Sequence, residues 1–83
     1  MAFLMQQMQW REQLENIEAQ QDSDQLVAFS ADIEQTQQAL LSELADALSS
    51  QQWQQAKVIN DKLRFIKKLL LEVERVEEKL LDF

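Results

Sequence analysis

The chain has 83 residues, with no Gly, Pro, Cys or His, and a formal net charge of −7. This length suffices for one small domain, and abundant helix formers without turn residues predict an all-α fold. The acidic balance argues against nucleic-acid binding. Without Cys or His there is no disulfide, thiolate metal site or nucleophile–His pair, so we predict no enzyme, no metal and no other cofactor.

The sequence gives no sign of a membrane partner. No stretch approaches the roughly 18 apolar residues of a membrane span. No basic segment precedes the apolar residues at the N-terminus, so we expect no signal peptide. The absence of Cys is compatible with a reducing compartment, and we predict a cytoplasmic location.

Two polar breaks divide the chain into three predicted helices, at about 2–20, 24–48 and 51–82. Because the connections are short, neighbouring helices should run antiparallel. We therefore predict one domain over residues 1–83, folded as an antiparallel three-helix bundle.

Each break contains the spacing of a capping box. Asp22 is followed three residues later by Gln25, and Ser49 is followed by Gln52. In this motif the cap side chain accepts hydrogen bonds from free N–H groups of the first turn. We predict Asp22 and Ser49 as the N-caps of the second and third helices.

The first predicted helix carries two apolar faces. At about 100° per residue their centres are roughly 150° apart. One face holds Phe3, Trp10, Leu14 and Ile17, and the other holds Leu4, Met5, Met8 and Glu12. Only one face can pack on two partner helices. The Trp10 set runs the length of the helix and is the predicted core face, which places Leu4, Met5 and Met8 outward.

Three explanations of the second face stay open at this point. A cluster of exposed apolar side chains often marks a partner-binding surface, and Met adapts its shape to a partner. The face could instead contact a missing domain or a second copy of the chain. It could also be additional core.

The other two predicted helices have simpler patterns. The second carries one core stripe: Leu26, Phe29, Ile33, Leu40, Leu44 and Leu48. The third carries a broad arc centred on Ala56, Ile59, Leu63, Ile66, Leu70 and Val73. A flank of Val58, Phe65, Leu69 and Val76 is predicted either as core or as exposed surface.

Charge is unevenly distributed along the chain. Residues 1–50 hold one base against nine acids, and residues 51–83 hold seven bases against six acids. Most bases lie between Lys57 and Lys68. They could complement acidic helices within the bundle, or form a basic patch for an acidic partner.

Acidic residues near the C-terminal end do not form a plausible catalytic or metal site. Glu72, Glu74, Glu77, Glu78 and Asp82 alternate with Arg75 and Lys79. Adjacent helical residues such as Glu77 and Glu78 point about 100° apart and do not converge. We interpret this segment as a solvated face.

Three segments resemble a known family. Residues 3–18 (FLMQQMQWREQLENIE), 62–69 (KLRFIKKL) and 76–83 (VEEKLLDF) are similar to the C-terminal domain of HscB, the J-type co-chaperone of bacterial iron–sulfur cluster assembly. The resemblance spans the whole chain and is weakest in the second predicted helix.

The resemblance implies a function and its partners. In this family the C-terminal domain binds IscU, the scaffold on which the cluster is built, and delivers it to the ATPase chaperone HscA. HscA is stimulated by an N-terminal J domain with a His-Pro-Asp loop. This chain has no His and no Pro. We therefore expect an excised domain that binds the scaffold without stimulating ATP hydrolysis.

The resemblance also implies a scaffold-binding site. Carried over by motif, it consists of Leu4, Met5, Met8, Gln9, Glu12, Asn16 and Phe65. Met8 stands where Leu is usual, and Gln9 and Asn16 replace carboxylates, so electrostatic steering toward a basic scaffold should be weaker. As an alternative function, the same apolar patch could mediate self-association in a helical homo-oligomer.

Overall fold

A computed structural model describes residues 2–81 of the chain. It contains α1 (Ala2–Gln20), α2 (Ser23–Ser49) and α3 (Trp53–Leu81), and no strand within those residues. The predicted all-α, three-helix fold is confirmed. The predicted end of the third helix, at residue 82, lies outside the described residues.

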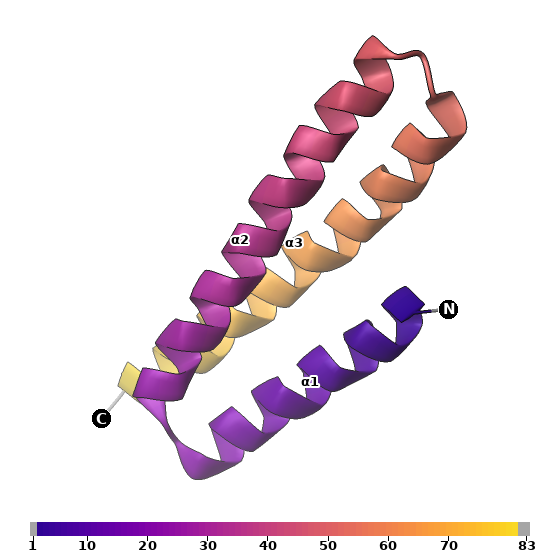
Figure 1. The fold of residues 1–83 in the computed structure, drawn as a ribbon. Coiled ribbons are helices and arrows are strands. Elements are labelled where there is room, and N and C mark those ends of the chain that lie inside the picture. Colours follow the sequence, from indigo (N-terminus) through magenta and orange to yellow (C-terminus); the bar gives the residue numbers. More distant parts are fainter. Residues whose placement is uncertain (1, 82–83) are drawn as a thin grey trace.

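The two long helices form an antiparallel hairpin, and the shorter α1 lies along its lower half (Figure 1). On α2, residues 26, 33, 40 and 47 are buried, and on α3 residues 59, 66 and 73 are buried. Both sets repeat every seven residues, the spacing that keeps one seam of a helix facing its partner. The hairpin seam is therefore packed like a coiled coil.

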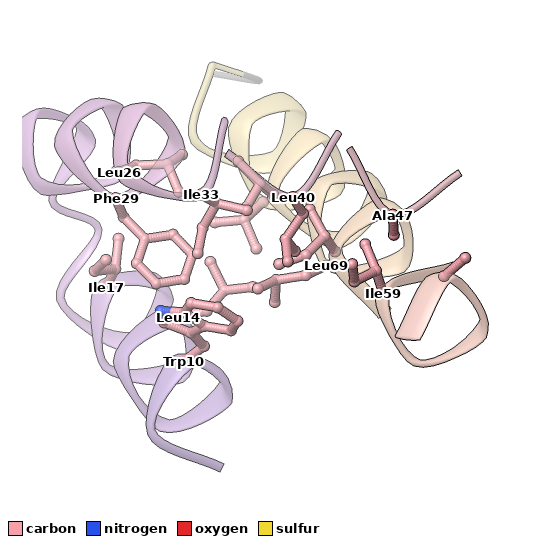
Figure 2. Close-up of a cluster of buried hydrophobic side chains, with 14 residues drawn as sticks. Trp10, Leu14, Ile17, Leu26, Phe29, Ile33, Leu40, Ala47, Ile59 and Leu69 are labelled. Atoms are coloured by element: carbon pink, nitrogen blue, oxygen red, sulfur yellow. The ribbon is translucent and has the colours of Figure 1, made fainter. Parts of the chain in front are cut away.

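The core face predicted for α1 is confirmed. Trp10, Leu14 and Ile17 are buried, and Phe3 packs half-buried against the same cluster. Figure 2 shows Trp10, Leu14 and Ile17 pointing from α1 toward the hairpin, with Phe29 and Leu69 among the side chains they approach. α1 thus closes one side of the α2–α3 seam.

The predicted core stripe of α2 is wrong at its C-terminal end. Leu44 is only half-buried and Leu48 is 47% exposed, whereas Ala47 is buried. The prediction advanced by four residues from Leu40, and each such step rotates about 40° past a full turn. The seven-residue step from Leu40 to Ala47 stays on the seam instead.

The structure also divides the ambiguous flank of α3. Leu69 and Val76 are buried, Phe65 is half-buried, and Val58 is exposed. The cause is the length of α1, whose first aromatic residue, Phe3, lies beside Lys62. Flank residues alongside α1 are covered, and Val58 lies beyond its end.

Both turns use the same closing motif, with Gln in the left-handed backbone region. Gln21 has φ 54° and Gln51 has φ 58°. After them, the N–H of Asp22 donates to the carbonyl of Ile17, and the N–H of Gln52 donates to the carbonyl of Ala47. These bonds define a Schellman ending, which usually places Gly at the left-handed position.

Of the two predicted N-caps, Asp22 is confirmed and Ser49 is wrong. Ser49 is the last residue of α2 and does not cap α3, which begins at Trp53 rather than at residue 51. Asp22 does cap α2, because its Oδ1 accepts a hydrogen bond from the N–H of Gln25 at 3.1 Å. The Ser49 prediction failed because Ser50 and Gln51 still belong to the ending of α2.

Candidate partner-binding surface

The outward face of α1 presents the apolar side chains predicted for it. Leu4, Met5 and Met8 are 56%, 64% and 65% exposed. They occupy one and a half turns at the beginning of the helix, on the side opposite Trp10. Helical periodicity therefore separated a buried face from an exposed apolar face correctly. The interpretation of the second face as additional core is wrong.

Polar residues continue this face toward the C-terminal end of α1. Gln9, Glu12 and Asn16 are all exposed, and together with Gln13 they line a shallow, open hollow. The six predicted site residues on α1 thus form one continuous strip, apolar at its N-terminal end and polar further along. Glu12 supplies the only charge among the six.

Phe65, the seventh predicted site residue, lies in the seam between α1 and α3 rather than on this strip. Its ring stacks on Trp10 with centroids 6.1 Å apart and meets Phe3 edge-on at 5.9 Å. The Arg11 guanidinium lies 5.7 Å from the centre of the same ring. Phe65 is therefore part of an aromatic cluster that holds the beginning of α1 in place.

Two cationic side chains lie over rings of that cluster. Arg11 is one residue before Glu12 on α1 and covers the ring of Phe65. The Lys62 ammonium lies 5.3 Å from the centre of the Phe3 ring on the same seam. Two cations thus lie over the aromatic rings of the α1–α3 seam, a feature that sequence reasoning missed because it depends on how α1 sits on α3.

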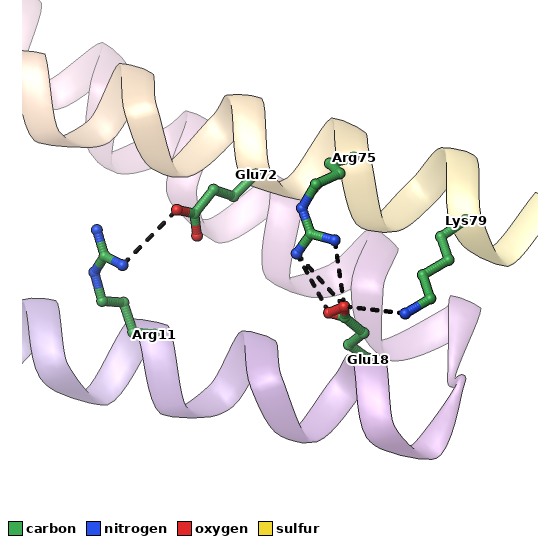
Figure 3. Close-up of polar contacts among 5 residues, drawn as sticks. All are labelled: Arg11, Glu18, Glu72, Arg75 and Lys79. Atoms are coloured by element: carbon green, nitrogen blue, oxygen red, sulfur yellow. Dashed lines mark hydrogen bonds and ion pairs between the residues drawn. The ribbon is translucent and has the colours of Figure 1, made fainter.

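Ion pairs fix the other end of α1 to α3 (Figure 3). Glu18 accepts from the Arg75 guanidinium at 3.4 Å and lies 3.6 Å from the Lys79 ammonium. Arg11 and Glu72 form a longer pair at 3.8 Å. Since the Arg75 and Lys79 side chains are largely exposed to water and Glu18 is half-buried, we expect these pairs to orient α1 and to stabilise the fold only modestly.

Hydrogen bonding from Arg75 lowers the pKa of Glu18 below its ordinary value of 4.5, assisted by the charge of Lys79. A lowered pKa in the folded state stabilises the fold above the ordinary value, and this stability is lost as the pH falls through the lowered value. We expect Glu18→Gln to melt below wild type at neutral pH and to match it in strong acid. Thermal melts over a pH series measure this, with Glu15→Gln as the exposed control. An equal gap at every pH would contradict the ion-pair explanation.

The basic run of α3 does not pair with the acidic helices. Lys57, Arg64, Lys67 and Lys68 are exposed, and none forms an ion pair within the described residues. The run therefore makes an outward, positively charged edge of α3. We considered that these bases neutralise acidic side chains of the neighbouring helices. No ion pair among the described residues supports that interpretation.

Residues 2–81 contain neither a cluster of potential metal ligands nor a helix that could cross a membrane. No group of three acidic side chains there is placed to hold a metal ion. None of the helices is both long enough and apolar enough to cross a bilayer.

Comparison with known proteins identifies the family. Residues 1–74 match the family described as the HSCB C-terminal oligomerisation domain. Two relatives named co-chaperone protein HscB homolog are 66% identical over 83 residues (Mannheimia succiniciproducens) and 56% identical over 81 residues (Haemophilus influenzae). A third, from Haemophilus ducreyi, is 43% identical over 81 residues.

These matches cover the chain almost completely but the relatives only in part. They include 100%, 98% and 98% of this chain, against 48%, 47% and 47% of the respective relatives. The chain therefore spans about half the length of the curated relatives it matches. With the family match over residues 1–74 and the three-helix fold, this chain belongs to the family of HscB C-terminal oligomerisation domains.

Proposed function

We propose that the chain is the scaffold-binding part of a co-chaperone of iron–sulfur cluster assembly. In this proposal it binds an IscU-type scaffold through the outward strip of α1 and presents it to an HscA-type chaperone in the cytoplasm. The observation that carries the proposal is the exposure of Leu4, Met5 and Met8 on a helix whose opposite face is packed against the hairpin. The family match supports the co-chaperone context.

The binding free energy expected from the apolar end of the strip suits a transient interaction with a partner. Fully burying a Leu or Met side chain contributes roughly 1.5–3 kcal/mol, so three side chains that are already partly covered give about 3–6 kcal/mol. Association itself costs several kcal/mol. The apolar end of the strip alone therefore supports weak to moderate binding, as a protein that must later release its cargo requires.

The polar end of the strip sets orientation more than affinity. Glu12 offers a carboxylate to a basic partner, while Gln9 and Asn16 offer neutral amides in the same hollow. Charges at the rim of an interface mainly accelerate association. With one carboxylate instead of three, steering by this strip should be modest and sensitive to salt.

Titration of the purified scaffold into the chain tests the proposal. We expect the double variant Met5→Ala/Met8→Ala to bind at least about tenfold more weakly, since a loss of 1.4 kcal/mol produces that change. Calorimetry or fluorescence measures the affinity. Leu71→Ala is the control because Leu71 is an apolar residue of similar exposure, 56%, that lies on α3. If the double variant bound the scaffold with unchanged affinity, the α1 strip would not be the scaffold-binding site.

Self-association is a second candidate function, favoured by the family's description as an oligomerisation domain. If it used the α1 strip, a second copy would compete with the scaffold for Leu4, Met5 and Met8. Scaffold binding would then weaken as the concentration of the chain rises. Self-association through another surface would leave the affinity for the scaffold constant.

A further inference from the structure

The apolar end of the α1 strip contains two methionines, Met5 and Met8. The chain has three methionines and no cysteine, and the third methionine, Met1, lies outside the described residues. Met5 and Met8 therefore carry the only sulfur atoms among residues 2–81. In a chain without thiols, the thioether sulfur of methionine is the main site of oxidation by peroxides.

Both methionine side chains lie on the solvent side of α1. They are 64% and 65% exposed, more than Leu4 in the same strip. They are three residues apart, so they are neighbours on the surface of the helix. The opposite face, with Trp10 and Leu14, is buried against the hairpin. An oxidant in solution thus reaches both side chains without any opening of the fold.

We propose that Met5 and Met8 are a paired oxidation site, at which hydrogen peroxide converts the apolar end of the α1 strip into a polar surface and thereby releases the scaffold. The inference rests on the proposed function, because it assigns a regulatory chemistry to the same surface. Of the three apolar side chains at this end, two can be oxidised and only Leu4 cannot.

The chemistry is the transfer of one oxygen atom to each sulfur. A lone pair of the thioether sulfur attacks one oxygen of hydrogen peroxide, so that an S–O bond forms while the O–O bond breaks. The displaced hydroxide takes the proton from the transferred oxygen and leaves as water. Each methionine loses two electrons and becomes a sulfoxide, and each peroxide is reduced to water.

Oxidation removes most of the apolar surface that the strip offers to a partner. A sulfoxide is polar, and burying its oxygen without a hydrogen-bond donor is unfavourable. The carboxylate of Glu12 and the net charge of −7 do not change. Because charges at an interface mainly set the association rate, the loss of affinity should appear mostly as faster dissociation.

The same oxidation should leave the fold intact. The side chains that hold α1 to the hairpin are those of Phe3, Trp10, Leu14 and Ile17, and none of them contains sulfur. Changes at exposed positions usually have small effects on stability. The oxidised chain should therefore lose affinity for the scaffold while its thermal midpoint stays close to that of the reduced chain.

Mapping of the oxidised residues tests the site without any partner. The folded chain and the chain unfolded in urea are treated with hydrogen peroxide, and peptide mass spectrometry follows the sulfoxide at each methionine. We expect Met5 and Met8 to be oxidised at similar rates in the folded and in the unfolded chain. Strong protection of either residue in the folded chain overturns the proposal.

Titration of the scaffold tests the consequence for binding. Peroxide is removed before the titration, so that only this chain is oxidised. We expect the oxidised chain to bind the scaffold at least about tenfold more weakly, with an unchanged thermal melt by circular dichroism. Equal affinity of the oxidised and reduced chains, or a loss of affinity that is due to unfolding, contradicts the proposal.

The double variant Met5→Leu/Met8→Leu is the matched control, because Leu is similar in volume to Met and cannot form a sulfoxide. Peroxide should leave the affinity of this variant at its own value before treatment. Met1 keeps its sulfur in the variant, so a loss of affinity as large as in the wild type would assign the effect to another residue and refute the proposal.

Reduction of the oxidised wild type should reverse the effect. The two classes of methionine sulfoxide reductase, one for each sulfoxide epimer, are applied together. Mass spectrometry then shows when both sulfoxides have been removed. The reduced product should regain the original affinity for the scaffold, and a product that stays weak after complete reduction counts against the proposal.

The outcomes separate this inference from the proposed function. If the untreated chain does not bind the scaffold, the proposed function is wrong and the control of binding by peroxide is wrong with it. If the untreated chain binds and the oxidised chain binds equally well, only the control by peroxide is wrong. The mapping of Met5 and Met8 is independent of both titrations because it needs no scaffold.

Discussion

Replacing Trp10 with Ala should lower the free energy of unfolding by about 3–5 kcal/mol. Trp10 is 8% exposed, and its ring contacts both Phe65 and Phe3. Removing it leaves a cavity between α1 and α3. A domain of this size often has only about 3–5 kcal/mol of net stability, so the variant should be largely unfolded at room temperature.

Chemical denaturation followed by circular dichroism measures this change. Trp53→Ala is the matched control, because Trp53 is the same residue type but 63% exposed, and it should cost well under about 1 kcal/mol. Met5→Ala should also have an effect this small. If Met5→Ala or Trp53→Ala proved more destabilising than Trp10→Ala, the core face of α1 would be wrongly assigned.

Replacing Phe65 with Ala should lower the free energy of unfolding by about 2–3 kcal/mol, somewhat less than a fully buried Phe. The ring is only half-buried, but it contacts two aromatic rings and the Arg11 guanidinium. Phe65→Leu retains most of the apolar volume and should cost about half as much or less. Denaturation curves of the two variants provide the comparison, and equal stability of Phe65→Ala and wild type would contradict the aromatic cluster.

The position of Phe65 changes how its role in scaffold binding must be tested. A partly unfolded variant binds more weakly in proportion to its folded fraction, even if the residue never contacts the partner. The affinity of Phe65→Ala should therefore be measured at a temperature where circular dichroism shows it to be folded. A loss that persists there would support direct contact between Phe65 and the scaffold.

Much of α1 could be predicted because local periodicity alone determines which side chains share a face. Trp10 and Met5 are five residues apart, about 140° around the helix, and the structure buries the first and exposes the second. The role of Phe65 could not be predicted in the same way. Its burial depends on where α1 begins along α3, which no local pattern records.

The errors in α2 and in the second turn have different physical causes. Leu48 was predicted as core because each leucine step looked regular, yet a coiled-coil seam repeats every seven residues and selects Ala47. Ser49 was predicted as a cap because its spacing to Gln52 was suitable. The helix ending that overrides it uses Gln51 at a position where Gly normally signals the motif.

The short length of α1 has a consequence for the dynamics of the hairpin. Close to its turn, α2 and α3 extend beyond the beginning of α1 and pack only against each other (Figure 1). Opening free energies in proteins follow the local density of buried contacts. Backbone amides near Ala47 and Ala56 should therefore exchange with solvent through local fraying, whereas those near Ile33 and Val76 should exchange only when the whole domain unfolds.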